Sequence, residues 1–73
     1  MSRAQFHVVP AGDQWRIERD GLTVSEHPTQ EEAIQQAREQ AQASKPSQLL
    51  VHGRDGRIED ESTYQDDPFP PRG

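Results

Sequence analysis

The chain has 73 residues, of which 29% are hydrophobic, and its formal net charge is −5. A chain of this length forms one domain at most, with a small core. It contains no cysteine, which excludes disulfides and thiolate metal sites, and its acidic balance disfavours a general nucleic-acid or anionic-membrane binder, because both need clustered Lys and Arg.

Three short strands are predicted in the first third of the chain. Residues 5–9 and 15–19 alternate apolar and polar side chains, and residues 10–13 between them have the composition of a turn. Residues 22–25 alternate in the same way. This spacing is typical of a meander of antiparallel strands.

The dipeptide Asp20-Gly21 predicts a type I′ turn between the second and third strands, because both residues tolerate positive φ. A two-residue loop pairs Arg19 with Leu22 and Ile17 with Val24. That register places the apolar side chains of both strands on one face of the sheet.

A capped helix is predicted over residues 30–43. Thr29 suits the N-cap position, and Glu32 three residues later completes a capping box. Ser44-Lys45-Pro46 ends the helix, because proline cannot continue the backbone ladder. The apolar face is a narrow stripe in which only one residue is large: Ala33, Ile34, Ala37 and Ala41.

Two further strands are predicted at residues 47–52 and 57–61, with a turn at residues 53–56. Leu49 and Val51 share one face of the first of these strands. Ile58 is the only apolar residue of the second, which is expected to be an edge strand.

The elements together predict an α+β fold in the order β-β-β-α-β-β, an antiparallel sheet with one helix packed on one face. We expect residues 1–64 to form a single small domain and residues 65–73 to form a flexible Pro-rich C-terminal tail. The predicted core consists of the apolar residues expected between the sheet and the helix: Phe6, Val8, Trp15, Ile17, Leu22, Val24, Ala33, Ile34, Ala37, Ala41, Leu49, Val51 and Ile58.

The sequence resembles a small bacterial family, Domain of Unknown Function 2188. The matching features are the strand with Trp15 and Ile17, the helix start at residues 29–34, the segment at residues 50–58, and Tyr64 before Asp67-Pro68. The front half is also similar to the YegP-like family. The resemblance implies a compact stand-alone domain, with no activity, cofactor or catalytic residue to carry over.

Three histidines, His7, His27 and His52, invite a metal-site interpretation. They lie in separate elements, without the short spacing of recognised zinc sites. The favoured interpretation is that they are ordinary strand residues with access to solvent, and no metal or cofactor is expected. A zinc-dependent rise in the melting temperature would be the sign of a metal site.

No catalytic constellation is expected, so we predict that the protein is not an enzyme. The carboxylates at residues 59–61 and 66–67 fit a solvated charged surface, and residues 53–56 are too short for a phosphate-binding loop. Pro68-Phe69-Pro70-Pro71 fits a bare PxxP motif, although a disordered terminus is the favoured interpretation.

The sheet face opposite the helix is the candidate interaction surface. A face left uncovered in this way is either a dimer interface or partner site, or a plain solvated surface, and both interpretations stay open. The residues predicted on it are His7, Val9, Arg16, Glu18, Thr23, Ser25, Leu50 and His52.

The leading functional hypothesis is a non-catalytic module that binds a protein partner, including a second copy of itself. The alternative is a nucleic-acid-associated domain, since four arginines lie near the predicted hairpins: Arg16, Arg19, Arg54 and Arg57. The net charge argues against that alternative. With no apolar run suited to a signal peptide or a membrane span, we expect a cytoplasmic location and no membrane contact.

Overall fold

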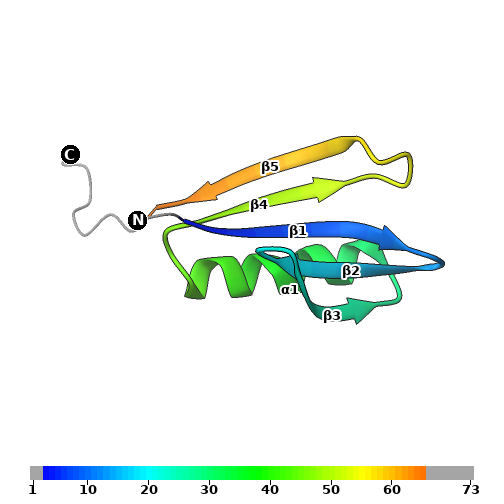
Figure 1. Cartoon of the computed structure of the whole chain (residues 1–73), viewed down its shortest axis with the longest axis horizontal. Helices are drawn as coiled ribbons and strands as arrows, with labels where there is room; N and C mark the ends of the chain where they lie inside the picture. The colour runs from blue at the N-terminus through cyan, green and yellow to red at the C-terminus, as the bar shows by residue number, and fades with distance from the viewer. Residues whose placement is uncertain (1–2, 66–73) are drawn as a thin grey trace.

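The computed structural model, which describes residues 3–65, contains a five-stranded sheet with one α-helix against one of its faces (Figure 1). The predicted element order is confirmed. The predicted tail lies outside the described residues from residue 66 onward, and so does its PxxP segment. The elements are β1 (Ala4–Ala11), β2 (Gln14–Arg19), β3 (Leu22–His27), α1 (Gln30–Ala43), β4 (Ser47–His52) and β5 (Ile58–Tyr64).

The sheet is mixed rather than wholly antiparallel, which corrects the prediction. Its strand order is β3-β2-β1-β4-β5, and the central pair, β1 and β4, is parallel. Direction alternates through β1, β2 and β3, and α1 then runs back along the sheet before β4 begins. The strand that follows the helix therefore points the same way as β1.

The core lies between α1 and the middle of the sheet. The helix packs mainly on β1, β2 and β4 and less on β3. In β1 the buried residues Phe6 and Val8 alternate with half-buried ones, as the predicted period of two requires. Nine apolar residues of the described chain form the buried cluster: Phe6, Val8, Trp15, Ile17, Ala33, Ala37, Ala41, Leu49 and Val51.

The helix approaches the sheet closely because its buried face is made of alanine. Ala33, Ala37 and Ala41 are fully buried, whereas Ile34 lies at the margin, half-buried against the cluster. The predicted N-cap is confirmed, since the Thr29 hydroxyl accepts a hydrogen bond of 3.1 Å from the Glu32 N–H.

A buried serine ties the end of the helix to the sheet. The Ser47 hydroxyl is fully buried and donates a hydrogen bond of 2.6 Å to the Ala41 carbonyl oxygen. That carbonyl also accepts a hydrogen bond of 3.1 Å from the backbone N–H of Ser44, the C-cap residue. Ser47 therefore satisfies its own buried hydroxyl and adds a second hydrogen bond to the end of the helix.

The β2–β3 hairpin has the predicted turn and begins in the predicted register but does not keep it. Asp20 and Gly21 have φ of 50° and 88°, and Arg19 pairs with Leu22. A β-bulge then pairs Ile17 with Ser25. Val24 is the extra residue, so its predicted pairing with Ile17 is wrong.

Three residues predicted in the core are exposed. On the edge strand β3, Leu22 is 74% exposed and Val24 is 45% exposed, because the helix covers this strand less than β1, β2 and β4. On β5, Ile58 is 55% exposed. A second register shift, between Val51 and His52, pairs Ile58 with His52 and places it on the face away from the helix.

No helix within residues 3–65 is long and apolar enough to cross a membrane.

Candidate functional site

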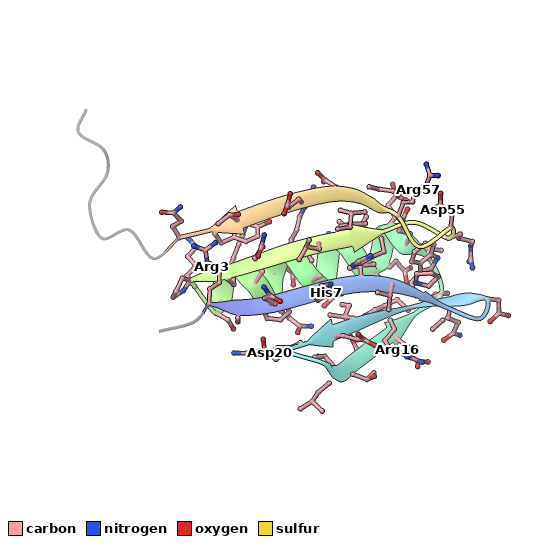
Figure 2. All side chains as sticks on the ribbon, turned by 45° about the horizontal axis from the view of Figure 1, so that its top comes forward. Arg3, His7, Arg16, Asp20, Asp55 and Arg57 are labelled. Carbon is pink, nitrogen blue, oxygen red and sulfur yellow. The ribbon has the colours of Figure 1, made fainter. Side chains whose placement is uncertain are left out.

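The face of the sheet turned away from α1 is termed the open face, and it gathers the residues that the sequence predicted there. Figure 2 shows His7 and Arg16 on the near side of the sheet, with α1 behind it. They alternate along their strands with the buried residues that face the helix. All six principal candidates are half-buried on this face: His7, Val9, Arg16, Glu18, Leu50 and His52.

The bulge in β3 changes the membership of the open face at one edge. Thr23 pairs with Glu18 and lies on the predicted side. Ser25 does not, because it pairs with the buried Ile17. Glu26 pairs with Arg16 and occupies the open face instead.

Two histidines meet at the centre of the open face. The parallel β1–β4 pairing places His7 opposite Leu50, so His52 is the diagonal neighbour of His7. The His7 Nδ1 and His52 Nε2 atoms are 3.0 Å apart, the ring centroids are 5.2 Å apart, and the ring planes differ by 26°. The distance between the ring centroids exceeds the distance between the facing nitrogens by nearly two ring radii. The two nitrogens therefore lie close to the line that joins the centroids, and the rings meet edge to edge.

This geometry is that of a hydrogen bond between two imidazoles, in which one ring nitrogen donates its N–H and the other accepts. Burial lowers the pKa of His7, and His52 lowers it further, while Glu18 and Asp20 act in the opposite direction. The neutral state of His7 is thereby favoured. That state fits the pairing, because two protonated rings would both be donors and would repel each other.

The third histidine lies apart from this pair. His27 pairs with Trp15 on β2, and its Nε2 atom is 3.0 Å from the Ser25 hydroxyl oxygen. The structure therefore brings together two of the three histidines that the sequence singled out. Within residues 3–65 no cluster of three or more His, Cys, Asp or Glu side chains is suited to hold a metal ion.

Apolar side chains interleave with the histidine pair. His7 lies opposite Leu50 across the β1–β4 ladder, and His52 lies opposite Ile58 across the β4–β5 ladder. The half-buried Val9 follows on β1. Sequence reasoning assigned Ile58 to the core and so missed it as a member of the open face. The register shift beside Ile58 turns its side chain from the helix-covered face to the open face, and the sequence pattern does not show that shift.

The β2 flank of the open face carries one arginine between two glutamates. Arg16 contacts Glu18 at 3.6 Å and Glu26 at 3.5 Å. The Arg16 Nε atom is shielded from water but lacks a hydrogen bond of good geometry. Such partly exposed ion pairs contribute little to stability, and here they leave the flank with one negative charge in excess.

The other arginines of the nucleic-acid hypothesis do not form one basic patch. The Arg19 guanidinium lies 5.3 Å from the Phe6 ring centroid. Arg54 lies 4.9 Å from the Trp15 centroid and donates a hydrogen bond of 2.9 Å to the carbonyl oxygen of Gly12. Arg54 thus joins the β4–β5 turn to the β1–β2 turn.

The remaining arginine and the carboxylates of β5 have local partners. Arg57 is 3.8 Å from Asp55 within the same turn. Glu59 accepts a hydrogen bond of 3.0 Å from the Gln30 amide, and Glu61 accepts one of 3.1 Å from Gln48. The carboxylates at positions 66 and 67 lie outside the described residues.

Comparison with known proteins identifies the family of the chain but no activity, ligand or partner. A family model described as "Uncharacterized protein conserved in bacteria (DUF2188)" matches residues 6–64. No curated protein and no solved structure matches the chain significantly. The similarity of the front half to the YegP-like family stays a prediction. The matched segment runs from β1 to the last residue of β5 and includes the whole open face, and on this match the chain belongs to the DUF2188 family.

Proposed function

We propose that this domain is a non-catalytic protein-interaction module that binds its partner through the open face. The observation that carries the proposal is the uneven cover of the sheet: α1 shields one face, whereas the other carries the exposed Ile58 and the half-buried Val9 and Leu50 beside the histidine pair. We further propose that the protein acts in the cytoplasm, which suits a chain without cysteine.

The distribution of side chains on the open face supports this function. An antiparallel sheet commonly leaves one face solvated, and that face is then polar. Here Val9, Leu50 and Ile58 come from three neighbouring strands, β1, β4 and β5. Apolar residues gathered in one place and bordered by charged groups are typical of a protein-binding surface.

The first partner to test is a second copy of the chain. We expect light scattering coupled to size exclusion to show a mass that rises with protein concentration. The Leu50→Arg variant should remain monomeric, because an interface that buries Leu50 would have to bury an unpaired guanidinium. Circular dichroism should show the fold unchanged, since Leu50 points away from the core.

Gln36→Arg is the matched control, because it adds the same charge at an exposed position of α1. It should associate like the wild type. A strict monomer at high wild-type concentration contradicts self-association. Equal loss of association in the two variants contradicts the assignment of the interface to the open face.

A further inference from the structure

We propose that the His7–His52 pair is a binding site for a divalent transition-metal ion, with Zn²⁺ as the test case. The two imidazoles are 45 residues apart in the chain and are brought together by the parallel β1–β4 pairing. Imidazole is a preferred ligand of zinc, and the described chain places no other pair of histidine nitrogens at this distance.

The separation of the two nitrogens suits a shared ion. Zinc–nitrogen distances are about 2.0–2.1 Å, so two imidazole nitrogens on one ion lie roughly 2.8–3.4 Å apart for N–Zn–N angles between those of square and tetrahedral coordination. His7 Nδ1 and His52 Nε2 are 3.0 Å apart. The observed separation therefore lies within the range that a shared ion requires.

Metal binding requires the two rings and one proton to be rearranged. In the edge-to-edge pair a hydrogen lies between the two facing nitrogens. Metal binding requires both of these nitrogens to be unprotonated, so each neutral ring carries its hydrogen on the other nitrogen, His7 Nε2 or His52 Nδ1. Each ring then turns about its Cβ–Cγ bond until the two lone pairs converge on a point beside the line that joined the nitrogens.

The surroundings of the pair favour a cation and leave it accessible. Glu18 lies directly opposite His7 across the β1–β2 ladder, and Asp20 also acts electrostatically on His7. Each carboxylate also contacts an arginine, Glu18 with Arg16 at 3.6 Å and Asp20 with Arg19 at 3.8 Å, so the two offset the charge of the ion in part. His7 and His52 are half-buried on the open face, so water can fill the remaining coordination positions. Two protein ligands with open positions make an exchangeable site rather than a closed structural one.

The test is thermal unfolding of the full chain, prepared without a polyhistidine tag, over a titration with zinc chloride. A ligand that binds the folded state raises the melting temperature, here by about 4–8 °C once zinc reaches roughly five times its Kd. Magnesium chloride at the same concentrations should cause no rise, because Mg²⁺ prefers oxygen ligands. The absence of a zinc-specific shift overturns the proposal.

Three glutamine variants locate the site. His7→Gln and His52→Gln should each abolish the zinc-dependent rise, whereas His27→Gln should keep it, because that residue lies on β3 with Ser25. Equal loss in His27→Gln overturns the assignment. Proton NMR of the wild type gives the same answer without any variant: the imidazole signals of two histidines should shift with zinc, and a shift of all three or of none contradicts the pair.

Discussion

His7 is the residue whose ionisation most directly changes the centre of the open face. Burial and His52 hold its pKa below the ordinary value of 6.5 in the folded protein. The unfolded chain therefore takes up this proton at a higher pH than the folded chain. The stability associated with neutral His7 is present above about pH 6.5 and is lost as the pH falls through the folded pKa.

This linkage predicts a difference between two proteins measured free of metal. Urea unfolding in the presence of a chelator should give a free energy of unfolding that falls between pH 7.5 and pH 5.5 in the wild type. In His7→Gln the decrease should be smaller, because the glutamine cannot take up the proton. The same decrease in both proteins would show that His7 is not the source.

Single residues also show where sequence reasoning succeeded. Phe6 and Val8 on one strand, and Trp15 and Ile17 on the next, alternate with polar residues, and this pattern was enough to place all four in the core. It failed at Val24 and Ile58, each of which lies next to a register shift. An extra residue in one strand moves every following side chain to the other face, and strand propensity carries no information about where that residue is inserted.

Among the elements, α1 depends unusually strongly on its ends. Its buried face is alanine, so the helix itself buries little apolar area. We predict that Thr29→Ala lowers the free energy of unfolding by about 1 kcal/mol, since the Glu32 N–H loses its acceptor. Chemical denaturation measures this change. Thr63→Ala, at an exposed position of β5, is the control and should cost less than about 0.5 kcal/mol.

An equal loss in both threonine variants would mean that the cap does not stabilise the helix.

The cap and the bounds of α1 were predictable, because the sequence that forms them is contiguous. The parallel pairing of β1 with β4 was not predicted: the helix makes one return pass along the sheet, so β4 points the same way as β1. The histidine pair was not predictable either, because it depends on which strands become neighbours, and the order β2-β1-β4 arises only when the helix packs over them.

At the scale of the whole molecule, burial is concentrated in the middle of the sheet. The buried cluster draws on β1, β2, β4 and α1, whereas β3 and β5 contribute no fully buried apolar residue. The Gln30–Glu59 hydrogen bond ties β5 to the start of the helix, and Tyr64 packs at the margin of the cluster. Segments that bury little surface open at low free energy.

Native-state hydrogen exchange should therefore proceed at different rates in the central and the edge strands of the sheet. We predict that β1 amides bonded to β2 or β4 exchange only through global unfolding, whereas β5 amides bonded to β4 exchange faster, through local opening. Restricting the comparison to hydrogen-bonded amides removes the trivial effect of unpaired edge groups. Equal protection of β5 and β1, measured by NMR, would show that the sheet opens as one unit.

Because β5 carries Ile58 and its partner strand carries Leu50 and His52, local opening of β5 would remove one border of the open face. A partner bound there should accordingly slow the exchange of β5 more than that of β1.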